Sequence, residues 1–187
     1  MGFLSFGSKK GKVKKMLEGD QIQLVVEDAV KDKKVREALF ELLQDSNPGI
    51  VGDALLTIVM VMENNPDVIK PHLNEETIKR LLSLVESRNP YVRENAMILL
   101  YRLAKDLPDV ARKYWGLFMK EAERVLREGD LNQKGFMLVL IGEFRIKELE
   151  GLVKNLVDVE DKVILPFEGE KWVKLGDIAR ETLEKLV

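Results

Sequence analysis

The sequence predicts an all-α protein folded as an α-solenoid, which is an array of stacked helix pairs. The first observation is an internal repeat, because residues 35–70 return 42 residues later as residues 77–112. The second is that short motifs match in this one register: Asn47-Pro48 with Asn89-Pro90, and Pro66-Asp67-Val68 with Pro108-Asp109-Val110. A period of about 40 residues that holds two helical patterns is typical of a helix-pair solenoid, which presents a surface rather than a pocket.

The composition excludes several classes of protein. The chain has 187 residues, of which 45% are hydrophobic, so it can bury a sizeable core. Lys plus Arg total 30 and Asp plus Glu total 32, so the net charge of -2 gives no general argument for binding nucleic acid or membranes. Cysteine is absent, which excludes disulfides, thiolate metal sites and cysteine nucleophiles. The frequent Lys and Glu residues resemble a thermophile's composition.

The N-terminus predicts a flexible arm over residues 1–11. Its apolar residues Phe3, Leu4 and Phe6 precede the lysines, which is the reverse of the order in a signal peptide. The longest apolar run, residues 50–62, is shorter than the ~20 residues that a membrane-spanning helix needs. We therefore expect a cytoplasmic protein with a frayed terminus. The alternative, that the arm inserts into a membrane or a partner while its lysines attract anionic groups, is less favoured.

Residues 12–187 are predicted to form a single repeat domain. Its parts are an irregular N-terminal repeat (12–31), repeat 1 (32–73), repeat 2 (74–115), repeat 3 (116–146) and repeat 4 with a hairpin and a capping helix (147–187). The terminal repeats are expected to be atypical, because each end of an array must cover its exposed face.

The irregular N-terminal repeat is expected to contain two helices. The first is predicted over residues 12–18 and ends at Gly19, and Asp20 suits the N-cap of the second. Residues 21–31 carry apolar side chains on more than one face, which predicts a helix buried within the array.

Repeats 1 and 2 each predict an outer helix with an apolar stripe and an inner helix. The inner helices are expected at about residues 48–64 and 90–106, each after an Asn-Pro pair. Asparagine accepts hydrogen bonds from free amides at a helix start, and proline fits the first turn, where its missing N–H costs nothing. Asn74 is expected to cap the outer helix of repeat 2 in the same way.

The last two repeats depart from this pattern. Repeat 3 resumes the outer stripe and turns at Gly129-Asp130 into an inner helix at about residues 131–145. In repeat 4, residues 162–167 and 171–175 alternate β-branched and aromatic side chains around a glycine turn, which predicts a short β-hairpin. An amphipathic helix from Asp177 is expected to close the chain.

Two runs of sequence carry a family resemblance: Asn89-Pro90-Tyr-Val-Arg-Glu-Asn-Ala and its weaker copy Asn47-Pro48-Gly-Ile-Val-Gly-Asp-Ala. Over residues 32–187 the chain resembles HEAT-repeat proteins, particularly small prokaryotic and archaeal arrays. Repeat 1 departs from the family pattern at Val51, where repeat 2 has Arg93, and repeat 3 lacks the proline. The resemblance implies a right-handed superhelix of about four helix pairs with a concave inner face. It implies no reaction, because most members bind proteins or nucleic acid.

No catalytic constellation is visible. His72 is the only histidine, so a paired-histidine metal site cannot form from one chain, and we expect an ordinary surface residue. Carboxylates between residues 148 and 161 predict a solvated acidic edge, with a hard cation as the weaker alternative. Phosphate-binding glycine loops and nucleophile elbows are absent from the sequence. We therefore expect neither enzyme activity nor a cofactor.

The mismatch between the two best copies gives the candidate site. In the 42-residue register, Val51 and Met60 stand where repeat 2 has Arg93 and Arg102. If that strip faces solvent, repeat 1 exposes an apolar patch, which either the segment 22–30 or a partner covers. Candidate partner-binding residues are Val51 and Met60 for apolar contact and Arg93, Arg102 and Lys105 for polar selectivity.

The sequence thus predicts a non-catalytic scaffold that binds another protein, with self-association left open. The alternative is a nucleic-acid binder, either a simple one or one related to DNA glycosylases. Its basic stripe would consist of Arg88, Arg93, Arg102, Arg112, Lys134 and Arg145. Carboxylates are interleaved with these residues and weaken the positive field, so the protein scaffold is favoured: Asp53, Glu63, Glu94 and Glu143.

Overall fold

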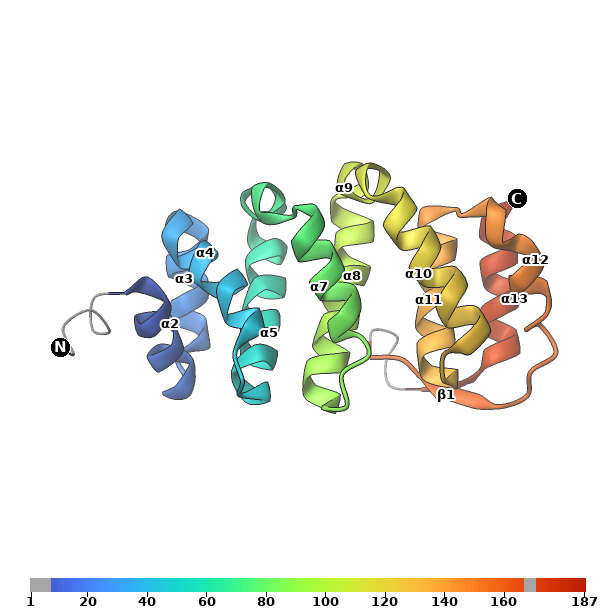
Figure 1. The fold of residues 1–187 in the computed structure, drawn as a ribbon, viewed down its shortest axis with the longest axis horizontal. Helices are drawn as coiled ribbons and strands as arrows, with labels where there is room; N and C mark the ends of the chain where they lie inside the picture. Colours follow the sequence, from blue (N-terminus) through green and yellow to red (C-terminus); the bar gives the residue numbers. More distant parts are fainter. Residues whose placement is uncertain (1–7, 167–170) are drawn as a thin grey trace. The chain divides into compact units, whose positions relative to one another are not determined.

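The structure is a computed structural model that describes residues 8–166 and 171–187. The described residues form twelve α-helices, three short 3-10 turns and one two-stranded antiparallel hairpin (Figure 1). The predicted all-α class with a short C-terminal hairpin is therefore confirmed. The chain divides into two compact units, one ending at Arg102 and the other beginning at Leu103.

Unit 1 consists of helices that pack in pairs around an aliphatic core. Its elements are α2 (Lys9–Glu18), α3 (Ile22–Lys31), α4 (Lys33–Glu41), η1 (Leu42–Gln44), α5 (Pro48–Asn64), α6 (Pro66–Ile69), η2 (Lys70–His72), α7 (Glu75–Leu84) and most of α8 (Pro90–Asp106). Helix α2 packs against α4, and α3 packs against α5 (Figure 1). Leu39, Leu55 and Ile78 are among the fully buried side chains of this core.

Unit 2 contains the end of α8 and the rest of the chain. Its elements are α9 (Pro108–Lys113), α10 (Trp115–Glu128), α11 (Leu131–Phe144), η3 (Lys147–Leu149), α12 (Glu150–Lys154), β1 (Lys162–Ile164), β2 (Trp172–Lys174) and α13 (Leu175–Leu186). Helix α11 is the centre of this unit, since it contacts α10, α13 and β1. Phe136 of α11 is fully buried there.

The predicted helix caps are present. Asn47 Oδ1 accepts from Gly49 N at 2.9 Å, and Asn74 Oδ1 accepts from Thr77 N at 2.9 Å. Asn89 Oδ1 accepts from Val92 N at 3.2 Å, which places both Asn-Pro pairs at the starts of inner helices. The repeated motif therefore fixes where α5 and α8 begin.

Two predictions near the N-terminus are wrong. Helix α2 begins at Lys9 rather than residue 12, because the Ser8 hydroxyl accepts from Gly11 N at 3.1 Å and caps the helix. The rest of the predicted arm, residues 1–7, lies outside the described residues. Asp20 is not an N-cap; it ends α2 with a left-handed backbone at φ 56°. Its N–H donates to Leu17 O, and the next N–H reaches Met16 O, which is a Schellman ending.

Helix α11 ends with the same hydrogen-bond pattern at Arg145. This residue has φ 55°, its N–H donates to Gly142 O at 3.2 Å, and Ile146 N donates to Ile141 O at 3.0 Å. Glycine is the usual residue at such a position, because a Cβ there is strained by about 1–2 kcal/mol. Arg145 and Asp20 both hold this conformation without being glycine.

The predicted hairpin is confirmed for the described strands. Val163 pairs with Val173 in an antiparallel register, and the predicted turn at residues 168–170 lies outside the described residues. Helix α13 begins at Leu175, two residues before the predicted start at Asp177. Leu175 N donates to Asp161 O at 2.9 Å, so backbone carbonyls of the preceding loop replace a side-chain cap.

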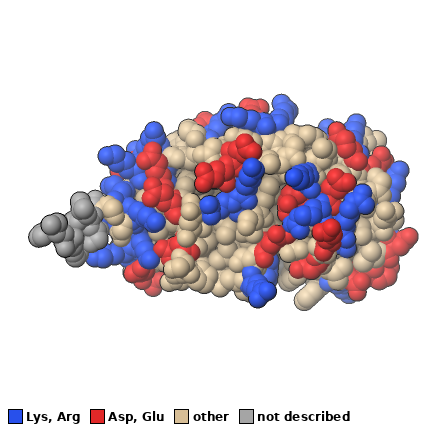
Figure 2. Space-filling view, in the orientation of Figure 1, with Lys and Arg blue, Asp and Glu red and all other residues tan. Residues whose placement is uncertain are grey.

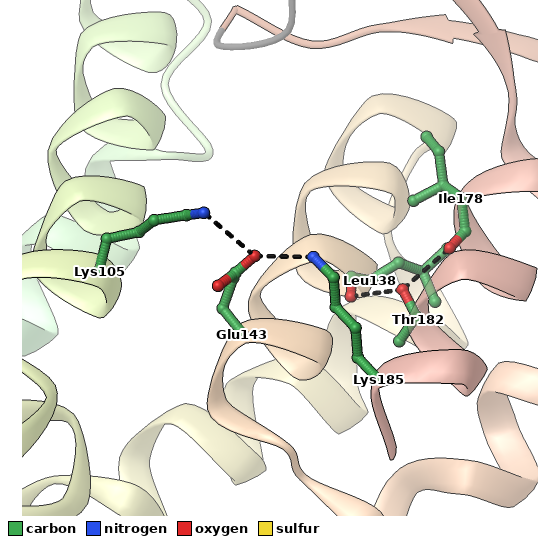
Figure 3. Close-up of polar contacts among 6 residues, drawn as sticks. All are labelled: Lys105, Leu138, Glu143, Ile178, Thr182 and Lys185. Carbon is green, nitrogen blue, oxygen red and sulfur yellow. Dashed lines mark hydrogen bonds and ion pairs between the residues drawn. The ribbon is translucent and has the colours of Figure 1, made fainter. Parts of the chain in front are cut away.

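Small residues let α13 approach α11 closely. A Cβ on Gly142 would lie 3.1 Å from Lys185 Cδ and 3.6 Å from Thr182 Cα. The buried Thr182 hydroxyl lies 2.8 Å from Leu138 O and 2.9 Å from Ile178 O, so it links the two helices (Figure 3). Glu143 directly follows Gly142 in α11, so it lies beside this close contact.

Among the described helices, none is both long and apolar enough to cross a membrane.

Candidate functional site

The five predicted partner-binding residues differ in their surroundings. Val51 is only 5% exposed and lies beside Arg80, Leu84 and Val92, at a pocket of about 330 Å³. Its side chain is therefore buried where repeats 1 and 2 meet, and the prediction that it adds apolar area for a partner is wrong. Met60 is half-buried and retains contact with solvent.

The segment expected to cover repeat 1 does pack against it. Helix α3 contacts α5 and buries Val25, Val26 and Ala29. A pocket of about 250 Å³ remains where α3 meets the end of α5 at Asn64, and Met60 does not line it. Helix α3 thus covers one side of α5, and the side that carries Met60 remains at the surface.

Helices α5 and α8 are joined at one end by Tyr91. Its hydroxyl donates to Asp53 Oδ1 at 2.6 Å, and burial together with this carboxylate raises the pKa of the Tyr91 phenol. The Tyr91 ring lies on the backbone of Gly52, where an added Cβ would come within 2.0 Å of Cδ1. Only glycine allows this approach, so the Tyr91 ring packs on Gly52 while its hydroxyl is held by Asp53.

The same two helices are joined at their other end by an ion pair. Arg102 Nη2 lies 3.1 Å from Glu63 Oε1. The separation in sequence is 38 residues at the Tyr91 end and 39 residues at this end, so the register between the helices is nearly constant. By this offset Met60 lies opposite residues 98 and 99, and of these only Ile98 is not fully buried.

Between these two polar links the helices present half-buried apolar side chains. They are Leu56 and Met60 of α5 and Ile98 and Tyr101 of α8, which we call the α5–α8 band. The positions 53, 56, 60 and 63 fall on one face of α5, and 91, 94, 98 and 102 fall on one face of α8. An apolar centre bounded by polar groups is the usual arrangement of a protein-binding surface.

Arg93 is not part of the band. Its Nη1 donates to Ser87 O at 3.3 Å, and the side chain is half-buried. Arg93 thus holds the turn that precedes α8. The valine at the matching position of repeat 1 also contributes to packing, so both copies use this position inside the fold.

Lys105 lies in unit 2 and takes part in a three-residue cluster. Its Nζ is 3.7 Å from Glu143 Oε1, and Lys185 Nζ is 2.8 Å from the same oxygen. Figure 3 shows the two ammonium groups approaching the Glu143 carboxylate from α8 and α13. The Glu143 side chain is 17% exposed, so the two lysines neutralise a carboxylate that is partly removed from water.

These ion pairs reduce the support for a nucleic-acid surface. Three cations of the predicted basic stripe or site are within 4 Å of carboxylates: Arg102 with Glu63, Lys105 with Glu143, and Arg112 with Asp109 at 3.9 Å. Figure 2 shows acidic and basic side chains interspersed over the visible face. A continuous patch of basic side chains, which phosphate binding requires, is not visible on that face.

His72 is more than an isolated surface residue. Its ring stacks on Phe40 with centroids 5.2 Å apart, and Arg36 Nε donates to His72 Nε2 at 3.2 Å. The same arginine donates through Nη1 to Ala29 O, so it links η2 to the end of α3. Burial, followed by the charge of Arg36, lowers the pKa of the His72 imidazole. A neutral imidazole is what allows Nε2 to accept this hydrogen bond.

Within the described ranges, no three His, Asp or Glu side chains are placed to hold a metal ion. The acidic residues predicted as a solvated edge include Glu150 and Glu160, which pair with Lys154 and Lys174. Both pairs are exposed, as expected of a solvated edge.

Comparison with known proteins gives a fold and no activity. No family model matches the chain, and no curated protein matches it. A crystal structure described as an engineered protein, a target of the Northeast Structural Genomics Consortium, is similar with a TM-score of 0.58 and 14% identity. The match covers 94% of this chain and 79% of that one. At this identity the similarity concerns the helical fold alone.

The sequence pattern missed the Tyr91 link and the apolar partners of Met60. A signal for the link was present, because Gly52 is a glycine in the middle of a helix, where it costs about 1 kcal/mol relative to alanine. Such a glycine indicates close approach of another group. Ile98 gave no signal of its own, since its exposure depends on the register between α5 and α8.

Proposed function

We propose that the protein is a non-catalytic scaffold that binds another protein through the α5–α8 band. In this proposal the chain is a HEAT-like, right-handed array that works in the cytoplasm. The 42-residue period and the Asn-Pro caps at α5 and α8 support the repeat assignment. The band supplies the binding surface, with Met60 and Ile98 at its centre.

One observation carries the proposal: four half-buried apolar side chains stay in contact with solvent on two helices that polar contacts join at both ends. Folding leaves this apolar surface accessible between polar groups whose positions are fixed. A partner that binds there can exclude water from the apolar surface without having to order it first. Rigidity matters because less conformational entropy is lost on binding. The Tyr91–Asp53 and Arg102–Glu63 contacts provide this rigidity.

The test is affinity capture of partners from the source cell with wild-type protein and the Met60→Lys variant. Met60 is half-buried at the surface, so Met60→Lys can extend its ammonium into water and should change stability by less than about 1 kcal/mol. We expect the captured protein to fall at least about tenfold, because a desolvated hot-spot contact contributes about 1–2 kcal/mol or more.

The matched control is Leu131→Lys, which also replaces an apolar side chain with lysine, at an exposed leucine of unit 2. It should leave capture unchanged. Equal loss with both variants, or no loss with Met60→Lys, would remove the band from the proposal. Nuclease treatment before capture tests the alternative of a nucleic-acid binder, because partners held through nucleic acid are then lost. Binding to nucleic acid would also fall steeply as the salt concentration rises. Sedimentation of the purified protein tests self-association through the same band.

A further inference from the structure

The charged groups at the two ends of the α5–α8 band are unevenly distributed, and this indicates the chemistry of its partner. We propose that the band binds an amphipathic helix of the partner protein that has Lys or Arg at one end, placed over Asp53 and Glu94. The inference rests on the proposed function, since it assigns an occupant to the same surface. Its arguments are the length of the band, the state of its backbone groups and the distribution of its carboxylates.

The dimensions of the band suit a short helix. From Asp53 to Glu63 is ten residues of α5, which at 1.5 Å per residue is about 15 Å, or roughly three helical turns. The apolar side chains Leu56 and Met60 are spaced by one turn along this length, as are Ile98 and Tyr101 on α8. A helix with apolar residues at i, i+3 or i+4, and i+7 would meet all four.

The backbone of the band argues against an extended peptide. Within α5 and α8 the peptide groups are bonded inside the helices, so they offer no row of free donors and acceptors for strand addition. In the described part of the chain, the sheet edges belong to the β1–β2 hairpin in unit 2. A peptide on the band must therefore satisfy its own backbone hydrogen bonds, which a helix does.

Two carboxylates that no described ion pair neutralises, Asp53 and Glu94, lie at one end of the band. Asp53 accepts its hydrogen bond from the Tyr91 hydroxyl, which brings no positive charge to the carboxylate. Glu94 is exposed and lies one turn after Tyr91 on the same face of α8. The guanidinium of the adjacent Arg93 is directed to Ser87 O. At the opposite end, Glu63 is already paired with Arg102.

The described ion pairs therefore leave a net negative end at Asp53 and Glu94 and a neutral end at Glu63. A cationic side chain over the first end gains Coulomb energy, whereas an acidic one is repelled. This fixes the sign of the partner's charge and places its basic end over Asp53 and Glu94. A partner helix bound the other way round would place its basic end beside Arg102.

The experiment is a display selection on the full-length immobilised protein. The library consists of helical peptides of about four turns with variable residues on one face and at both ends, and selection is repeated on two variants. The first variant is Met60→Lys, which blocks the apolar centre. The second is the double variant Asp53→Asn/Glu94→Lys, in which Asn keeps an acceptor for Tyr91 while the end becomes positive. Circular dichroism verifies that each variant is folded.

The expected result has three parts. Wild-type protein enriches peptides with the apolar i, i+3 or i+4, i+7 pattern and Lys or Arg at one end. Met60→Lys abolishes their binding, and the double variant binds them roughly threefold to tenfold more weakly while enriching Asp or Glu at that end.

Two results overturn the inference in distinguishable ways. Peptides that depend on Met60 but show no basic preference, or keep it on the double variant, refute the charged end and leave the proposed function standing. If no enriched helical peptide depends on Met60, the helical occupant is refuted. The scaffold function itself is then judged by the capture experiment with Met60→Lys and Leu131→Lys.

Discussion

The close packing of the Tyr91 ring on Gly52 predicts that a normally helix-stabilising substitution, Gly52→Ala, destabilises the protein. Gly52→Ala would by itself stabilise the middle of α5 by about 1 kcal/mol, because alanine is the better helix former. The added Cβ, however, would lie 2.0 Å from Tyr91 Cδ1 and 2.2 Å from Cε1. The ring must therefore move away from α5 and lose its hydrogen bond to Asp53. Overpacking and the lost bond together lower the free energy of unfolding by about 2 kcal/mol. The net expectation is a loss of about 1 kcal/mol.

A double-mutant cycle separates the two effects. With Tyr91→Ala in place, the obstacle is gone, so Gly52→Ala should stabilise the protein by about 1 kcal/mol. With Tyr91→Phe the ring remains, so Gly52→Ala should still destabilise. The coupling between positions 52 and 91 is then about 2 kcal/mol. The free energies come from urea denaturation followed by far-ultraviolet circular dichroism, compared at the transition midpoints.

The sign of the change in the two backgrounds decides the matter. Two results would show that the Tyr91 ring does not pack on α5. One is that Gly52→Ala stabilises the wild-type protein, and the other is that it changes the free energy of unfolding equally with tyrosine and with alanine at position 91. The register between α5 and α8 would then have one support instead of two. The α5–α8 band would have to be rebuilt from the Arg102–Glu63 pair alone.

Three further predictions concern other contacts. Arg145→Gly should stabilise the protein by about 1 kcal/mol in the same urea titration, because glycine adopts this backbone conformation without strain. Asp20→Gly should stabilise it by less, because aspartate tolerates φ near 55° better than arginine does. Arg145→Ala keeps the strain and should give no gain. His72 has a lowered pKa in the folded state, so the unfolded chain takes up the proton first. Stability should therefore fall as pH drops from about 7.5 through about 6.5, the ordinary pKa of a histidine. His72→Gln keeps an acceptor and should abolish that slope above about pH 5, whereas an unchanged slope would exclude His72 as its source. Glu143→Gln should lower the free energy of unfolding by about 1 kcal/mol at low ionic strength and by less in 1 M salt. The control Glu150→Gln, which breaks one exposed ion pair, should lower it by under about 0.5 kcal/mol. Equal losses in the two variants would show that the two lysines add nothing at Glu143.

The helix starts could be predicted because their chemistry is local. Asn47 and Asn89 cap helices through hydrogen bonds to amides two or three residues away, so the motif contains all the information that it needs. The hairpin was predictable for the same reason, since alternation and a glycine turn are both read within a dozen residues. Local rules also explain one failure, because Asp20 suits an N-cap by residue type, yet two backbone hydrogen bonds hold it in a left-handed C-terminal turn.

The candidate site was predicted only in part because exposure depends on neighbouring repeats. The matching of Val51 with Arg93 suggested an exposed apolar residue, but side chains of α7 and α8 cover the valine. Arg93 turns back to the loop before its own helix. Neither outcome is determined by the residue type or by the period, since both depend on where the next repeat places its side chains.

The differences between the two copies therefore have two physical roles, and the distance along the helix separates them. Near the start of the inner helices, repeat 1 has Gly52 where repeat 2 has Glu94, and the missing side chain makes room for Tyr91. Near the end, Met60 stands where repeat 2 has Arg102, and that arginine reaches back to Glu63 instead of to solvent alone. In both places repeat 2 supplies the long side chain and repeat 1 the complementary partner. Two identical copies could not form either contact, so the divergence that joins α5 to α8 is also what leaves an apolar strip open between them.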